Sequence, residues 1–538
     1  MRTGRRVVAA VALALLVLGA FAAPASAHAE LKESTPANGA RLELGPRQVV
    51  LHFSERVEVG LGGVRVFNRA GERVDRGRIT HPDGIGSEVA VALPSLRDGG
   101  YVVTWRVVSA DSHPVQGAFT FAVGDAAPAS TGDVAGLLGA TGGSKTVGVL
   151  YGFTRSLAFA AMLVLLGSVA FVLAFWPEGA ANGRYRLIAR TALIVVAVTS
   201  VLNLLLQGVY AAGLSLSDAV DPDVVGDVLG TRFGHVYLAR FVLLAVAAFV
   251  LPRAIQWRWV ALAVGVGIAA TPALAGHAAI GSFEPYALIA DVVHVSSAAV
   301  WFGAIAMLLG VVLVQVDFDD ATRVSNKFSA AAPYVVGVVV ATGLFQGYRQ
   351  VGSLDALRTT DYGKLLVVKA LLVAAVICVA YVSRHLLLKR WSPETMRTLR
   401  RSVMAEAALA IGVLSVTGLL VNAVPAKVEV AAPQSGELTS KTMLLDYTVS
   451  PGRAGANNIH LYALTKAGQP REVVEMTLSL AQAVRGIAPI DVNLEKAGLG
   501  HFQSIGFDIP FPGKWKLVIT ARTSEIDSET FEGTVEIR

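Results

Sequence analysis

The chain has 538 residues, of which 54% are hydrophobic and only 16% are charged. Soluble domains carry about 25% charged residues, so this composition excludes a purely soluble protein and a disordered chain. The single cysteine, Cys378, excludes an intramolecular disulfide and a CxxC metal site. The net charge of +6 is typical of a membrane protein with basic cytoplasmic loops. We therefore expect an integral membrane protein with soluble parts, whose surroundings are the lipid bilayer and which has no nucleic-acid partner.

Residues 1–27 have the pattern of a signal peptide. Basic residues precede an apolar run at 7–20, and Ala25-Ser26-Ala27 supplies a small-x-small cleavage box. The alternative is an uncleaved anchor helix. Cleavage after Ala27 would make His28 the first residue of the mature protein.

Residues 28–125 have a β pattern. Short alternating runs, such as 48–53, 63–67 and 101–105, are separated by turn residues and predict a small β-barrel or sandwich. Residues 126–146 are rich in Ala, Gly, Ser and Thr, which predicts a flexible linker.

Residues 147–425 contain apolar runs long enough to span a bilayer. They predict an eight-helix transmembrane bundle, with helices at about 147–176, 188–212, 236–252, 257–275, 286–315, 330–346, 364–388 and 403–424. Basic residues gather in alternate loops, while the loop around Asp218 and Asp227 on the other side is acidic. The positive-inside rule places the basic loops in the cytoplasm and both ends of the mature chain outside it.

Residues 426–538 return to alternating runs with turn signals and predict an extracytoplasmic, Ig-like β-sandwich. His460, Met476 and His501 are potential ligands in this part, and we expect each of them on its surface.

The first β-domain offers a set of copper ligands. An N-terminal His28 would present both its α-amine and its imidazole, and Asp111 and His113 stand at i and i+2, which lie on one side of an extended backbone. Amine, imidazole and carboxylate donors favour Cu(II). The alternative is that Asp111 and His113 only decorate a turn before Pro114.

The same domain resembles the copper-resistance protein family CopC. The resemblance rests on His28-Ala29-Glu30-Leu31, Leu51-His52-Phe53-Ser54-Glu55 and the run from Trp105 to Pro114. It implies an exported β-barrel that holds one Cu(II) through His28, Asp111 and His113, assisted by Glu55. Residues 28–125 contain no methionine, so the Cu(I) site of Met-rich members is not expected.

The membrane region resembles CopD, the membrane partner often fused to CopC. The matching motifs include Gly276-His277-Ala278, Asp291-Val292-Val293-His294 and Thr342-Gly343-Leu344. The resemblance implies passage of copper across the membrane. The C-terminal domain, through the run from Ile509 to Trp515, resembles FixH- or YtkA-like β-domains.

Ionisable residues within the spans point to a copper route. Asp291 and His294 share one helix face, His277 lies in the preceding outer loop, and His235 is at the outer start of the third helix. The alternative is a structural polar cluster that ties helix ends together.

Deeper in the bilayer, soft donors are suited to Cu(I), although such residues in apolar helices usually serve packing. These donors are Met307, Met162, Met404 and Cys378. We expect Lys369 and Glu406 to neutralise one another.

We therefore predict a CopC–CopD fusion protein of the cell membrane that captures Cu(II) outside and passes copper inward. An extracytoplasmic copper chaperone is a candidate partner. No nucleotide-binding loop or aspartyl-phosphate motif is present, so we expect no ATP-driven pump and no enzyme activity. The alternatives are copper sequestration without transport, and a haem-bearing membrane oxidoreductase.

Overall fold

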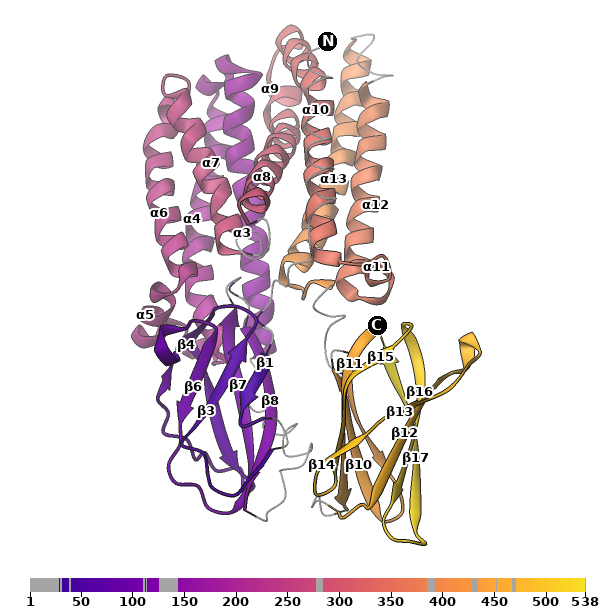
Figure 1. The fold of residues 1–538 in the computed structure, drawn as a ribbon. Helices are drawn as coiled ribbons and strands as arrows, with labels where there is room; N and C mark the ends of the chain where they lie inside the picture. The colour runs from indigo at the N-terminus through magenta and orange to yellow at the C-terminus, as the bar shows by residue number, and fades with distance from the viewer. Residues whose placement is uncertain are drawn as a thin grey trace. The chain divides into compact units, whose positions relative to one another are not determined.

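The computed structural model has three folded parts: a β-domain, a helical domain and a second β-domain (Figure 1). Every structural statement below concerns the residues that it describes, which are 29, 31–37, 40–109, 112, 114–124, 144–276, 284–384, 392–426, 434–450, 452–466 and 471–537. The predicted signal peptide and residues 126–143 of the predicted linker lie outside these residues, and the last two residues of that linker belong to the first long helix.

The first β-domain is a sandwich of two four-stranded sheets. One sheet has the strand order β1-β3-β6-β5 and the other β2-β8-β7-β4. The strands are β1 (Leu31–Thr35), β2 (Ala40–Leu42), β3 (Gln48–Phe53), β4 (Val57–Asn68), β5 (Ile79–Thr80), β6 (Glu88–Ala92), β7 (Gly99–Ser109) and β8 (Pro114–Val123).

The sequence alternation explains how the two sheets pack. In β3, Val49, Leu51 and Phe53 are buried and the residues between them are partly exposed, as expected for a strand with one face toward a core. Buried residues of both sheets, among them Leu51 of β3 and Phe121 of β8, form one hydrophobic cluster. The predicted β-sandwich is therefore confirmed.

The helical domain contains eight helices that are long and apolar enough to cross a membrane, counted over the described residues. The short helices α5 (Pro222–Gly230) and α11 (Ala356–Thr359) lie between spans. The long helices are α3 (Lys145–Ala174), α4 (Gly183–Ala212), α6 (Arg232–Val250), α7 (Arg258–Ala275), α8 (Glu284–Met307), α10 (Phe318–Val351), α12 (Asp361–Val382) and α13 (Pro393–Asn422).

Two spans begin ten or more residues earlier than their hydropathy predicts. The expected starts at 330 and 403 become Phe318 in α10 and Pro393 in α13. The cause is capping: Asp317 accepts a hydrogen bond from the Asp320 amide at 3.0 Å, and Ser392 forms a capping box with Thr395. The length of an apolar run measures only the part of a helix that lies in lipid. The two caps begin polar turns that precede the apolar run of each helix.

α8 lies between α3 and α10 (Figure 1). Gly167 of α3 and Gly303 of α8 face one another so closely that a Cβ atom at either position would collide with the backbone of the other helix. Small residues permit this close approach between membrane helices. The contact fixes the position of α8, which carries Asp291 and His294. Beyond Met307, α8 continues through a π-turn at Leu308–Val312 into α9 (Leu313–Gln315).

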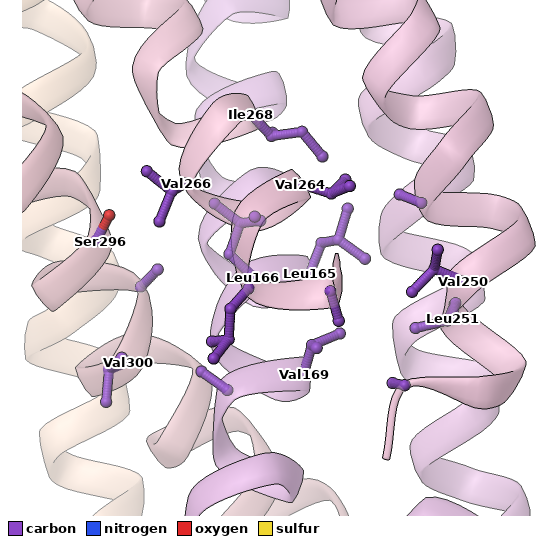
Figure 2. A pocket seen from close by; sticks show the side chains of 17 residues that line it. Leu165, Leu166, Val169, Val250, Leu251, Val264, Val266, Ile268, Ser296 and Val300 are labelled. Carbon is purple, nitrogen blue, oxygen red and sulfur yellow. The ribbon is translucent and has the colours of Figure 1, made fainter. Parts of the chain in front are cut away.

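A pocket of about 140 Å³ opens between α3, α7, α8 and the end of α6. Figure 2 shows aliphatic side chains around it, including Leu165, Val250 and Ile268, and Ser296 supplies the one polar side chain among its lining residues. Aliphatic carbon does not coordinate a metal, so this pocket fits a hydrocarbon chain and holds no copper ligands.

The C-terminal domain is a second β-sandwich, with sheets β14-β15-β11-β10-β9 and β13-β12-β16-β17. Its core centres on the fully buried Trp515 of β16 and includes Leu445 and Leu478 from the two sheets. The strands are β9 (Gln434–Thr439), β10 (Met443–Ser450), β11 (Gly455–Thr465), β12 (Glu475–Gln482), β13 (Ile487–Val492), β14 (Glu495–Gly498), β15 (His501–Ile509), β16 (Gly513–Arg522) and β17 (Ser528–Ile537).

One buried carboxylate holds the long connection between β4 and β5. The Asp75 side chain is fully buried and accepts hydrogen bonds from the amides of Val66 and Gly77 and from the Arg73 guanidinium, at 2.8–2.9 Å. Burial alone would raise the pKa of Asp75, but these donors outweigh it and hold that pKa below its ordinary value.

We predict that Asp75→Asn destabilises the first β-domain by about 2 kcal/mol. The asparagine side chain replaces one carboxylate oxygen by an NH₂ group, which cannot accept the hydrogen bonds that the backbone amides and Arg73 donate to Asp75. Asp83→Asn, at an exposed turn position, is the matched control. Hydrogen–deuterium exchange over residues 57–78 should be faster only in the first variant.

The pH dependence of stability provides a second readout for the same variant. Since the folded-state pKa of Asp75 is lowered, its stabilisation is present above the ordinary pKa and is lost as the pH falls through the folded value. The wild-type melting temperature should therefore fall more steeply below about pH 4 than that of Asp75→Asn. Equal slopes would contradict this role.

Candidate functional site

Two hydrogen bonds join the polar residues of α8 to those of α10. Gln346 donates from Nε2 to Asp291 Oδ1 at 2.7 Å, and His294 Nδ1 lies 2.8 Å from Thr342 Oγ1. Asp291 and His294 are one helical turn apart, as are Thr342 and Gln346, so both pairs form along one interface. At 1.5 Å per residue, His294 lies about 15 Å from the start of α8, well inside the span.

The hydrogen-bond network assigns the tautomer of His294. The Thr342 hydroxyl lies 2.6 Å from the carbonyl oxygen of Val338, which can only accept its single proton. Thr342 therefore accepts from Nδ1–H of His294. When the imidazole is neutral, this tautomer leaves the lone pair on Nε2. Because metal ions bind the unprotonated imidazole nitrogen, this arrangement prepares Nε2 as a ligand.

Gly343 gives the His294 ring room against α10. A Cβ atom at position 343 would lie 3.3 Å from His294 Cε1, tighter than an ordinary contact. The absence of a side chain therefore allows the imidazole to reach the neighbouring Thr342.

Asp291 lies in a locally cationic environment. Lys369 and Arg349 are the cations whose charges act on it. An incoming metal cation would compete with Lys369 for this carboxylate, which weakens binding at this position.

The expected neutralisation of Lys369 by Glu406 is wrong. Glu406 accepts a hydrogen bond from Ser383 Oγ at 3.0 Å, and the acidic group whose charge acts on Lys369 is Asp291. Ser383 follows Lys369 by 14 residues along the same helical segment, about 21 Å, so Glu406 packs at the other end of α12.

The other candidates of the membrane domain lie apart from this interface or outside the described residues. His277 lies outside them, and His235 is exposed in the first turn of α6. Met307 is fully buried in a hydrophobic cluster, about 20 Å along α8 from His294. In the described part of the chain, no three His, Cys, Asp or Glu side chains gather as a metal site.

The remaining soft donors do not share one environment. Met162 is buried in a separate hydrophobic cluster, whereas Met404 and Cys378 are exposed on the helix surfaces.

In the first β-domain, several strand ends meet at one end of the sandwich. Leu31 of β1 pairs with Phe53 of β3, and Val57 of β4 pairs with Ser109 of β7. Glu55 lies in the turn between β3 and β4, partly buried, with its Oε1 shielded from solvent. Three of the predicted ligands, His28, Asp111 and His113, lie outside the described residues.

The backbone between two of these ligands differs from the expectation. The argument for Asp111 and His113 assumed an extended chain, but Ser112 has a φ of 69°, in the left-handed region. Val108 of β7 pairs with Pro114 of β8, so Ser112 lies in the connection between these two antiparallel strands. The roles of Asp111 and His113 stay predictions.

Sequence reasoning missed Gln346 as a site residue and used Thr342 only as part of a family motif. The signal was present, because Thr342, Gln346 and Arg349 repeat at i, i+4 and i+7 in an otherwise apolar span.

Comparisons with known proteins agree with this architecture. The CopC domain model matches residues 31–124, the model of the copper resistance protein D-like N-terminal domain matches 146–284, and the copper resistance protein D model matches 322–420. The FixH- or YtkA-like nature of the C-terminal domain stays a prediction.

Several relatives resemble the chain over one or more domains. The copper transport protein CutJ of Bacillus subtilis (strain 168) is 28% identical over 525 residues, covering 93% of this chain and 94% of CutJ. Protein YobA of Escherichia coli (strain K12) is 34% identical over 113 residues, covering 21% of this chain and 91% of YobA. The crystal structure of CopC from Methylosinus trichosporium OB3b matches 18% of this chain and 93% of its own at 28% identity, with a TM-score of 0.16. The chain is thus a member of the copper-resistance family, with a CopC domain and a CopD multi-pass membrane domain joined in one polypeptide.

Proposed function

We propose that this protein captures Cu(II) outside the cell membrane through its first β-domain and passes copper inward through the helical domain. The single observation that carries the membrane step is the hydrogen-bonded pairing of His294 and Asp291 with α10, which leaves one imidazole nitrogen ready to bind a metal ion. The relatives named for copper transport and copper resistance support copper as the cargo.

The capture site consists of His28, Asp111 and His113, with Glu55 as an assisting carboxylate. The strand register supports this set. His28 precedes Leu31 by three residues, so the chain keeps it within about 11 Å of the strand end that pairs with Phe53. Asp111 follows Ser109 by two residues, and Ser109 pairs with Val57 beside the turn that holds Glu55. Glu55, Leu31 and Ser109 lie at one end of the sandwich, and the other three ligands are within four residues of Leu31 or Ser109 in the sequence.

We predict that adding one residue before His28 of the mature protein weakens Cu(II) binding at least tenfold, because the α-amine is displaced while every side chain stays. Competition titration with a chelator measures the affinity, and Cu(II) EPR reports the loss of one nitrogen ligand. Adding a residue at the C-terminus is the matched control. An unchanged affinity and EPR spectrum in the extended protein would exclude the α-amine as a ligand.

The transit site in the membrane consists of His294 and Asp291, with His277 and His235 on the outer approach and Met307 further inward. Lys369 competes with copper for Asp291, which keeps binding weak enough for release. A transport site needs this balance, because an ion that binds too tightly does not leave. Thr342 acts as a positioning residue through the tautomer of His294. Passage past Met307 would suit Cu(I), the softer ion.

We predict that His294→Ala abolishes copper uptake into cells, while Cu(II) binding by the first domain is unchanged. Thr342→Val should lower uptake only partly, since the ligand remains but its tautomer is no longer held. Uptake is measured as cell-associated copper at equal amounts of membrane-inserted protein. His81→Ala, in the first β-domain and hydrogen-bonded to the Glu88 carbonyl oxygen, is the control. If His294→Ala inserts correctly and transports at the normal rate, the α8–α10 cluster is structural.

Both β-domains lie on the extracytoplasmic side in this proposal. Eight spans return the chain to its starting side, and the loops with most of the basic residues then face the cytoplasm. An extracytoplasmic chaperone that hands copper to the first domain fits this orientation.

We predict opposite accessibility for two exposed positions, Asp221 before α5 and Arg397 in the first turns of α13. Single cysteines at these positions, in a Cys378→Ala background, should react with a membrane-impermeant maleimide from outside only at 221. After permeabilisation both should react. Labelling of both in intact cells would require an even number of spans between them, whereas the described residues contain five.

A further inference from the structure

We propose that the C-terminal β-domain carries a second copper site, formed by His460 and His501 on the outer face of its five-stranded sheet. The identity of the metal, copper, rests on the proposed function. The arrangement of the two imidazoles does not, because the structure describes both residues.

The two histidines come from adjacent antiparallel strands. His460 lies on β11 and His501 on β15, where His501 pairs with Tyr462 and His460 with Gln503. In β11, Ile459, Leu461 and Ala463 enter the core, so His460 and Tyr462 point to the opposite face. The expected surface placement is wrong for His501, which is only 9% exposed, and for Met476, which is buried in the core. His460 is partly exposed, which leaves the pair accessible from outside.

The spacing of the pair fits one metal ion. His460 Nδ1 and His501 Nε2 are 3.2 Å apart. Two imidazole nitrogens at about 2.0 Å from a tetrahedral ion are about 3.3 Å apart, and in a square-planar arrangement adjacent nitrogens are about 2.8 Å apart. A linear Cu(I) site would need about 4 Å. The observed separation therefore fits a tetrahedral or tetragonal ion such as Cu(II).

Without metal, the two nitrogens share one hydrogen. A bound ion would take the place of that hydrogen, and the ring that carried it would become the other tautomer. This exchange releases no net proton from a neutral pair.

The surroundings of the pair also suit a cation. The Tyr462 ring stacks on His501 with centroids 4.3 Å apart, and the buried Tyr462 hydroxyl has no hydrogen-bond partner among the described residues. Asp446 pairs with Tyr462 across β10 and β11, is 5% exposed, and its charge acts on the Tyr462 hydroxyl. A buried carboxylate that acts on the ring stacked against His501 adds negative charge to the surroundings of the pair, which favours a bound cation.

The site has two protein nitrogens and open coordination positions. No third His, Cys, Asp or Glu joins the pair within the described ranges. Water or a ligand from a partner would complete the coordination, as in a site that receives or hands on copper.

The test uses the full chain in detergent or nanodiscs and counts bound copper after equilibrium dialysis against Cu(II). Replacement by glutamine, in His460→Gln/His501→Gln, preserves hydrogen bonding and side-chain size and should remove one copper equivalent. The matched control, His52→Gln/His81→Gln, removes two histidines of the first β-domain and should retain all copper. An unchanged count in the first double variant, or an equal loss in the control, would overturn the proposal.

A second measurement separates this site from the capture site. In protein with one residue added before His28, the remaining Cu(II) should show EPR superhyperfine structure from two imidazole nitrogens, and this signal should disappear when His460 and His501 are also replaced. A spectrum with no such signal rejects the second site. The change in bound copper caused by the residue added before His28, by contrast, tests only the capture site in the first β-domain. The two failures are therefore distinguishable.

Discussion

The free-energy cost of holding polar side chains away from water governs the helical domain. A charged or hydrogen-bonding group inside a bilayer needs a partner from another helix, because lipid supplies none. Asp291 finds Gln346 and two nearby cations, His294 finds Thr342, and Glu406 finds Ser383. These contacts set which faces of α8, α10, α12 and α13 turn inward. The groups with a candidate role in copper transfer thus also specify the packing.

The architecture could be predicted from the sequence because each part has its own periodicity. Alternation every second residue identified both sandwiches, and apolar length identified eight spans. The starts of α10 and α13 could not be predicted in this way, because Asp317 and Ser392 cap polar turns that hydropathy ignores.

The candidate site could be predicted only in part. The spacing of Asp291 and His294 placed them on one helix face, but it did not identify α10 as the facing helix. That partner depends on tertiary packing, which a single sequence does not reveal. For the same reason Lys369 was assigned to Glu406, although about 21 Å of helix separates the positions that they occupy. His501 was expected at the surface because composition does not report how deeply a strand residue is covered.

The glycine contact between α3 and α8 has a mechanical consequence. Two helices in backbone contact at Gly167 and Gly303 cannot slide past one another without steric collision, so they move as one rigid body, a helix pair that acts as a fixed pillar. Any motion that opens the polar interface first to one side of the membrane and then to the other must be carried by the helices that move against this pillar. α10 is the helix across that interface, and it is joined to α8 by hydrogen bonds that can break and re-form. The carboxylate and imidazole of α8 would then stay still while their gate moves.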